Sequence, residues 1–283
     1  MAKKEKEIIP QYIASQLNTP LLNYKVYVMS PKEKILTFLV ALIAGGAIGL
    51  VFYGGQFRDE DGLRTIATYI CDVIIFLVVG ALSGIMAMPI REKSLRDKRK
   101  AKLTNQFRSF LDTLAVSLSS GMNMMDALQS AYKDLSSEFD EDAYIVAEVK
   151  EMMNGIQNNI PIESMIMSLG ERSEINEIKN FAKVFEISYR AGGNIKDIVR
   201  RTNEIIGEKI EIGEEIETAI SSNKTQFNVM MIVPVILVVL LKTMSSTFAA
   251  SFGTFVGVIA VTVAVGLFAL AYKIGTKIMN IKG

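Results

Sequence analysis

Histidine and tryptophan are absent from this chain of 283 residues, and cysteine occurs once, as Cys71. Without histidine the chain cannot form a Ser-His or Cys-His catalytic pair, an HExxH zinc site or an imidazole proton relay. A single cysteine excludes a disulfide framework and CxxC redox or zinc motifs. We therefore expect no enzyme activity, no catalytic residue, no cofactor and no metal-ligand set within one chain.

A surplus of charge is also lacking, because 31 Lys and Arg residues face 30 Asp and Glu residues. Nucleic-acid-binding domains are usually strongly basic, so no nucleic-acid partner is expected. What the chain does have is apolar residues, which make up 50% of the sequence. That share is typical of membrane proteins.

Four apolar stretches are long enough to be membrane spans, for which a helix needs about 20 residues. They run over Ile35–Tyr53, Ala67–Ile90, Phe227–Leu241 with its small polar extensions, and Phe255–Tyr272. The third stretch contains Pro234, which a membrane helix tolerates because neighbouring groups satisfy the freed backbone.

Basic residues predict how these spans are oriented. The first 34 residues hold six lysines against three glutamates, and residues 91–102 hold seven basic residues against two acidic ones. The loop after the first span has two arginines and three acids, and the loop after the third has only Lys242. Because basic flanks stay in the cytoplasm, both termini should be cytoplasmic and Asp61 should be accessible from outside. The expected segments are 1–34 (cytoplasmic), 35–90 (two spans), 91–226 (cytoplasmic domain), 227–272 (two spans) and 273–283 (cytoplasmic tail).

Two acidic features have alternative interpretations. Asp72 is either a functional acid within the membrane or, as we favour, a carboxylate near the outer interface. The five glutamates of 208–217 resemble a catalytic or calcium-binding cluster, but a solvated helix face explains them better, since calcium sites draw ligands from a compact loop. A metal shared between subunits stays open. These glutamates are Glu208, Glu211, Glu214, Glu215 and Glu217.

Between Leu103 and Gln226 the apolar residues recur at helical spacing, with one proline, and predict six helices. The predicted fold class is therefore all-α: a multi-pass helical membrane protein with one cytoplasmic six-helix bundle of helical hairpins. The sixth stripe, from Ile195 to Ile220, continues toward the third span without proline. Gly207 and Gly213 interrupt it, either as hinges or, as we favour, as places of close helix contact.

The turns between these helices share a pattern. "SSGMNMMDALQSA" (Ser119–Ala131) and "RAGGNIKDIVRRT" (Arg190–Thr202) each place a glycine after a helix, then an asparagine, then an aspartate three residues later. Glycine supplies the left-handed conformation past a helix end, and Asn-x-x-Asp is a variant of the capping box. A weaker copy, Met153–Ile166, has Gly155 as the stop and Pro161 as the helix start. The predicted turn and cap residues are Gly121, Asn123, Asp126, Gly155, Pro161, Gly192, Gly193, Asn194 and Asp197.

A glycine pair before a helix is also found where proteins hold phosphates. Gly192 and Gly193 are not followed by the lysine of a GxxxxGK[ST] loop, and no strand-like segment precedes them. Asp197 near the helix start would repel a phosphate. We therefore interpret the pair as a turn and not as a nucleotide site.

The elements "SGMNMMDAL" and "FAKVFEISYRAGGNIKDIVRRTNEII", set between membrane spans, resemble the helix-hairpin motifs of the type II secretion system F family. One such domain with flanking spans looks most like the TadB and TadC platform proteins of tight-adherence (Tad) pili. The general secretion platform protein carries two such domains, and only one is recognisable here.

This resemblance implies a non-enzymatic platform in the inner or plasma membrane, under a growing type IV-like filament. It implies a hexameric secretion ATPase, pilin subunits and a second platform protein of the same family as partners, in a homo- or hetero-oligomer within the lipid bilayer. A small transporter or receptor with a cytoplasmic regulatory domain is the alternative, although the spans lack paired buried charges. A membrane-bound aspartyl peptidase would need a second intramembrane-face aspartate beside Asp72.

Overall fold

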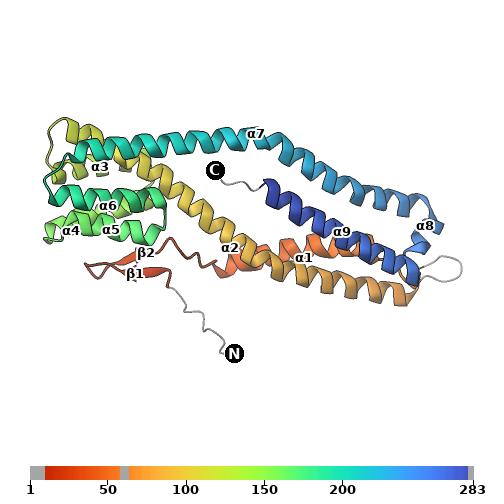
Figure 1. Cartoon of the computed structure of the whole chain (residues 1–283). Coiled ribbons are helices and arrows are strands. Elements are labelled where there is room, and N and C mark those ends of the chain that lie inside the picture. The colour runs from red at the N-terminus through yellow and green to blue at the C-terminus, as the bar shows by residue number, and fades with distance from the viewer. Residues whose placement is uncertain (1–9, 58–63, 280–283) are drawn as a thin grey trace, which may run out of the picture. The chain divides into compact units, whose positions relative to one another are not determined.

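The computed structural model describes residues 10–57 and 64–279 and is almost entirely helical (Figure 1). Asp61, the expected external probe site, lies outside the described residues, as do the ends of both termini. The elements in chain order are β1 (Tyr12–Ala14), β2 (Pro20–Leu22), α1 (Pro31–Tyr53), α2 (Ile66–Ser119), α3 (Met124–Glu138), α4 (Tyr144–Gln157), α5 (Ile162–Ser173), α6 (Asn176–Arg190), α7 (Ile195–Met244), α8 (Ser246–Ser251) and α9 (Phe255–Met279). The predicted all-α, multi-pass fold class is confirmed.

The chain divides into two compact units. The first, here called the bundle unit, combines the segment up to Val28 with Glu92–Glu211. The second, here called the span unit, combines Met29–Arg91 with Ile212–Gly283. Apart from the short passage at Val28–Met29, the chain passes between the units inside two long helices, α2 and α7.

The core of the bundle unit is built from the apolar stripes of its helices. On α2, Leu103, Phe107 and Phe110 are completely buried. The ring of Phe107 meets that of Phe181 on α6 edge to face, with centroids 5.5 Å apart. Because the spacing of three and four residues keeps these side chains on one face of each helix, one continuous core results. Among the described residues of α7, Val199 and Ile206 are the ones fully buried by it.

The segment 91–102 is helical and not a linker, since α2 continues through it from the second span into the bundle. The helix also contains Pro89, at the end of its apolar part. Proline has no backbone N–H, so one helical hydrogen bond is missing there. A membrane helix tolerates this loss because neighbouring groups satisfy the freed backbone carbonyl.

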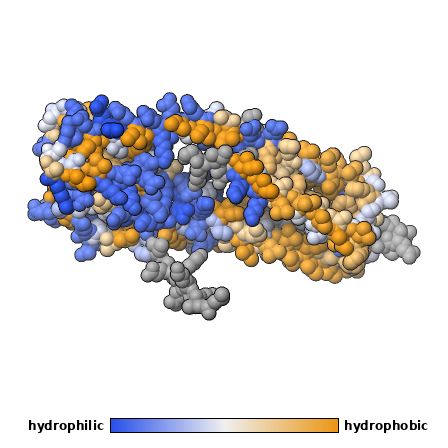
Figure 2. Space-filling view, in the orientation of Figure 1, coloured by the Kyte–Doolittle hydropathy of each residue, from blue (hydrophilic) through white to orange (hydrophobic). Residues whose placement is uncertain are grey.

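Four helices are long and apolar enough to cross a membrane: α1, the first part of α2, the second part of α7, and α9. The surface of the span unit is accordingly largely hydrophobic, whereas that of the bundle unit is largely hydrophilic (Figure 2). Large apolar side chains such as Ile35, Leu82 and Leu267 are more than half exposed. Such a surface is stable in lipid and unfavourable in water.

Helices α1 and α2 pack closely because glycines replace side chains at their contact. A Cβ at Gly45 would overlap the side chain of Ser83, and one at Gly84 would meet the ring of Phe38. The Ser83 hydroxyl donates a hydrogen bond of 2.8 Å to a backbone carbonyl of α1. Small residues spaced four apart allow membrane helices to approach in this way. The spaced glycines are Gly45 and Gly49 on α1 and Gly80 and Gly84 on α2.

Polar side chains satisfy the backbone where α1 ends. The carboxylate of Asp72 accepts a 2.8 Å hydrogen bond from the amide of Gly55, just beyond α1. The ammonium of Lys242 on α7 donates to the carbonyl oxygens of Val51 (2.8 Å) and Gly54 (3.2 Å). Asp72 thus has a structural partner at a helix end, which agrees with the interface interpretation.

Candidate functional site

Two of the predicted turns close their helices in the same way. Past α6, the amide of Gly193 donates to the carbonyl of Ser188 (2.7 Å), and that of Gly192 donates to Tyr189 (3.3 Å). Gly192 has a φ of 67° and Gly121, past α2, a φ of 87°. Both turns have the hydrogen bonds of a Schellman motif, which needs a left-handed residue after the helix.

The asparagines lie at the start of the following helices. Asn123 is the N-cap of α3, and its side-chain oxygen accepts from the amide of Asp126 at 2.9 Å. Asn194 accepts from the amide of Asp197 in the same way, at 3.4 Å. In each pair the asparagine amide also donates to the aspartate carboxylate, at 2.7 Å and 2.5 Å. The aspartate therefore binds the cap side chain, and not the cap backbone as in a full capping box.

The prediction that Gly155 ends a helix is wrong. Gly155 lies inside α4 and is buried, and a Cβ there would overlap the side chain of Met165 on α5. The left-handed residue is Asn159, with a φ of 61°. Its amide donates to Ile156 (3.0 Å), and the next amide donates to Gly155 (2.9 Å), so the third turn is also a Schellman motif. Gly155 is present because α4 and α5 approach each other closely, and Pro161 is the residue directly before α5.

The glycine pair is not arranged to bind a nucleotide. Both amides are already used within the turn, as donors to Ser188 and Tyr189. A phosphate at a helix N-terminus needs free amides and no nearby carboxylate, whereas Asp197 occupies the first turn of α7.

A site that the sequence did not predict lies where the N-terminal segment covers α4 and α5. Residues Pro10–Val28, here called the strap, contain the antiparallel hairpin β1–β2, with Tyr12 opposite Leu22. The hairpin turns through Asn18, whose φ is 59°. The strap is fixed to the bundle by hydrogen bonds from Thr19 to Glu151 and between Gln16 and Ser164.

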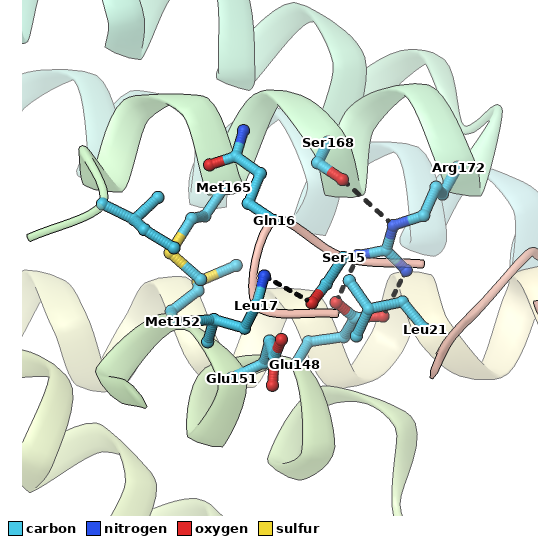
Figure 3. Close-up of a pocket in the computed structure, with 11 residues that line it drawn as sticks. Ser15, Gln16, Leu17, Leu21, Glu148, Glu151, Met152, Met165, Ser168 and Arg172 are labelled. Carbon is cyan, nitrogen blue, oxygen red and sulfur yellow. Dashed lines mark hydrogen bonds and ion pairs between the residues drawn. The ribbon is translucent and has the colours of Figure 1, made fainter. Parts of the chain in front are cut away.

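At the centre of this site is a buried ion pair between α4 and α5 (Figure 3). The Arg172 guanidinium donates to both carboxylate oxygens of Glu148, at 2.8 Å and 2.6 Å. Their side chains are only 7% and 5% exposed. The strap completes the pair: the hydroxyl of Tyr24 donates to Glu148 (3.0 Å), and Arg172 donates to the carbonyl of Leu22 (2.8 Å). We call Tyr24, Glu148 and Arg172 the clamp.

Two side chains of the clamp, Tyr24 and Arg172, have raised pKa values. Burial alone would lower the pKa of Arg172, but the hydrogen bonds and charge of Glu148 outweigh it and raise that pKa. Burial, reinforced by the charge of Glu148, raises the pKa of Tyr24 far above its ordinary value. A raised pKa means that the contribution of Tyr24 to stability is fully present below the ordinary tyrosine pKa and is lost only in strong alkali. The clamp is therefore a structural group at neutral pH.

The cavity beside the clamp is small. Its volume is about 20 Å³, and it is lined by residues of the strap, α4 and α5, among them Ser15, Glu151 and Met152 (Figure 3). About 10–15 Å³ is needed for one water molecule, so the cavity has room for water and not for a nucleotide or an organic cofactor.

The glutamates of α7 do not line this cavity. All five are exposed, and the described residues contain no group of three or more His, Cys, Asp or Glu side chains arranged to hold a metal ion. The helix also contains Gly207 and Gly213. A Cβ added at Gly207 would lie 3.1 Å from the side chain of Arg108, whereas a Cβ added at Gly213 would meet no described atom within 4 Å. Close helix contact therefore accounts for Gly207 only.

Residues 110–242 match the family model of Type II secretion system (T2SS), protein F. The chain carries a domain of the type II secretion system F family. No curated protein and no solved structure matches the chain. The matched residues include the turns, Glu148 and Arg172, while the strap and the basic stretch 91–102 lie outside the matched range. This match supports a general role as a platform in secretion or pilus assembly.

The left-handed glycine of the F domain provides one test of the turns. Gly192→Val should lower the free energy of unfolding by about 1–2 kcal/mol, because a β-branched residue is strained in this conformation. A Cβ at Gly192 meets no described atom within 4 Å, so the strain would come from the backbone alone. The measurement is denaturant unfolding of the purified protein, followed by circular dichroism.

The matched control is Gly192→Asn, which should cost clearly less. Asparagine adopts the left-handed conformation more readily, and Asn159 already occupies the equivalent place after α4. Equal losses for valine and asparagine would contradict the left-handed assignment of the turn.

The buried pair of the clamp generates a second prediction. Arg172→Met leaves the carboxylate of Glu148 buried without its partner and should destabilise the bundle by about 3–5 kcal/mol. The double variant Glu148→Leu/Arg172→Met removes both charges and should cost less than Arg172→Met alone. Unfolding measurements, with protease cleavage of the strap as a second readout, test both expectations.

An exposed pair on α7 is the control for the clamp. Arg200 and Glu204 lie 3.6 Å apart with side chains 64% and 57% exposed. Arg200→Met should change stability by no more than about 0.5 kcal/mol, as is usual for such pairs. If Arg172→Met costs equally little, the buried pair does not stabilise the bundle.

Proposed function

We propose that this protein is a non-enzymatic platform for assembly of a type IV-like (Tad) pilus or a related secretion filament. In this function it couples a hexameric ATPase in the cytoplasm to the movement of pilin subunits in the membrane. The observation that carries the proposal is the match over residues 110–242, which begins within α2 and ends within α7, two helices that each also contain an apolar span. A helix is the simplest element that passes a displacement from one side of a membrane interface to the other.

The proposed orientation places the bundle unit and both termini in the cytoplasm. The seven basic residues of 91–102 directly follow the second span, and the loops at the other ends of the spans have few lysines and arginines. The positive-inside rule then favours two hairpins that both open to the cytoplasm.

The absence of catalytic chemistry in the sequence fits this function. The chain has no histidine and one cysteine, and its buried ionised pair has every hydrogen bond directed to structural partners. Energy for movement would then come from another protein, namely the secretion ATPase.

The net charge of residues 103–226 favours binding of the ATPase. Residues 103–226 contain 21 acids and 12 basic residues, a net charge of −9. Such a surface attracts a basic partner at long range. The other proposed partners are pilin subunits and a second platform protein of the same family, with which the chain would form a homo- or hetero-oligomer.

If α7 transmits motion, breaking its helix should uncouple the two ends. Insertion of two glycines after Thr218 should abolish filament assembly and leave membrane insertion and ATPase binding intact, since glycine destabilises a helix interior by about 1 kcal/mol per residue. Filaments counted by electron microscopy provide the measurement.

Insertion of two alanines at the same place is the control, because it shifts the helix register equally and keeps the helix. Loss of filaments with glycine but not with alanine would support transmission by a rigid helix. Normal filaments from the glycine variant would show that the bundle is a passive dock.

The ATPase partnership predicts that the purified full-length protein alone neither binds nor hydrolyses ATP. Its binding to the secretion ATPase should weaken as sodium chloride rises, because salt screens the charges that guide the encounter. An equivalent concentration of sucrose is the uncharged control. Binding of ATP to this protein alone, or ATPase binding that is insensitive to salt, would contradict the proposal.

A further inference from the structure

Four basic side chains gather where the strap passes α2 on the bundle unit. Lys100 donates a 2.7 Å hydrogen bond to Glu174 at the end of α5. Arg96 lies one helical turn before Lys100 on α2, and Lys25 directly precedes Val26, which Arg99 contacts. The bond from Lys100 lowers the pKa of Glu174, and the charges of Lys25 and Arg96 add to this effect. Arg99 donates to the carbonyl of Val26 at 3.4 Å. The group Lys25, Arg96, Arg99 and Lys100 is here called the cradle.

The cradle has more positive charge than its neighbours neutralise. Among the described residues two acids are in contact with it: Glu174, bound to Lys100, and Asp97, whose carboxylate lies 3.6 Å from Arg96. Four positive charges therefore face two negative ones within this part of the chain. Within residues 10–57 and 64–279, the buried Nε atoms of Arg96 and Arg99 have no hydrogen-bond acceptor.

The strap holds the cradle in a defined geometry. The guanidinium of Arg99 lies over the ring of Tyr27, 4.3 Å from its centroid. The guanidinium is itself planar, and stacking on the aromatic ring holds that plane in one orientation, so its outer N–H groups are positioned for the oxygens of a phosphate. Tyrosine itself favours the level of lipid headgroups.

Of the cradle residues on α2, Arg96 lies closest to those headgroups. Arg96 follows Ile90, the last residue of the apolar stretch of α2, by six residues, or about 9 Å along the helix. The polar layer of a bilayer extends roughly 5–8 Å beyond the hydrocarbon core. Arg99 follows three residues after Arg96, about 14 Å from Ile90. Side chains of a helix lean toward its N-terminus, so both arginines lean back toward the membrane.

We propose that the cradle binds the phosphate of an anionic phospholipid headgroup and thereby fixes the strap and α2 to the membrane surface. The site is distinct from general attraction between a basic helix and anionic lipid, because only part of the stretch 91–102 contributes to it. The inference rests on α1 and α2 crossing the bilayer and does not depend on the proposed ATPase partner.

The stretch itself provides a matched control. Lys93 and Lys98 lie on the same helix and are exposed to solvent, outside the cradle. Arg96→Gln/Arg99→Gln and Lys93→Gln/Lys98→Gln therefore remove the same charge at nearly the same depth. If the attraction is diffuse, both double substitutions should reduce the preference for anionic lipid equally. If the cradle is a defined site, only the substitution of Arg96 and Arg99 should reduce it strongly.

The test uses full-length protein in nanodiscs of phosphatidylcholine into which phosphatidylglycerol with brominated acyl chains is titrated. The chain has no tryptophan, so Val28→Trp beside Tyr27 gives a single reporter whose quenching measures local enrichment of the anionic lipid. Native mass spectrometry of lipids retained by the unmodified chain repeats the comparison without the reporter. A parallel titration adds inorganic phosphate to nanodiscs that already contain the brominated phosphatidylglycerol, which separates lipid from free phosphate.

We expect loss of both cradle arginines to reduce the preference for the anionic lipid at least about tenfold, and loss of both lysines to change it less than about threefold. Equal losses from the two pairs, or no preference in the parent protein, would overturn the proposal. Displacement of phosphatidylglycerol by inorganic phosphate would identify free phosphate as the ligand and overturn the membrane assignment. All of these readouts are independent of ATPase binding, so their failure is distinguishable from failure of the proposed function.

Discussion

The buried ion pair between Glu148 and Arg172 is the constraint on which the arrangement of the bundle depends. Two ionised groups removed from water are stable only when nearly all their hydrogen bonds are satisfied, and here α4, α5 and the strap each contribute to that requirement. Apolar packing alone allows helices to slide by small amounts at little cost. A bidentate pair that also needs a tyrosine hydroxyl and a backbone carbonyl allows one arrangement, so the clamp selects the register between these three segments.

The span unit is stabilised by a different means. In lipid there is no hydrophobic force to bring helices together, and close approach of backbones takes its place. Glycines let α1 and α2 approach in this way, and the Ser83 hydrogen bond adds a polar contact between them. The two units are thus stabilised by different interactions. A buried ion pair and an aromatic core stabilise the bundle unit, whereas close backbone contact at glycines stabilises the span unit. Helices α2 and α7 belong to both, so each must carry both kinds of sequence pattern along one element.

The sequence allows correct prediction of features that depend on local spacing. Apolar periodicity locates the six helices, and the Gly-x-Asn-x-x-Asp pattern locates the turns at Gly121 and Gly192, since both signals lie within a few residues of the structure they specify. Gly155 shows the limit of this reasoning. A glycine that allows another helix to approach cannot be distinguished, from its own position in the sequence, from a glycine that ends a helix. Asn159, which supplies the left-handed residue instead, was available as a signal, since asparagine is the next best residue in that conformation. The clamp could not be predicted, because nothing local distinguishes Tyr24 or Arg172 from other residues of their kind.

The distance between the strap and its partners along the chain has a consequence for biosynthesis. Tyr24 and Glu148 are separated by 124 positions, and Leu22 and Arg172 by 150. A ribosome that makes the strap first must complete α1, α2, α3, α4 and α5 before the strap has a surface to bind, because contacts this remote cannot form until both parts have emerged. The first two spans are therefore available to the insertion machinery while the strap is still undocked. Closure of the clamp becomes a late step of maturation, one that occurs only after the first membrane hairpin has been made.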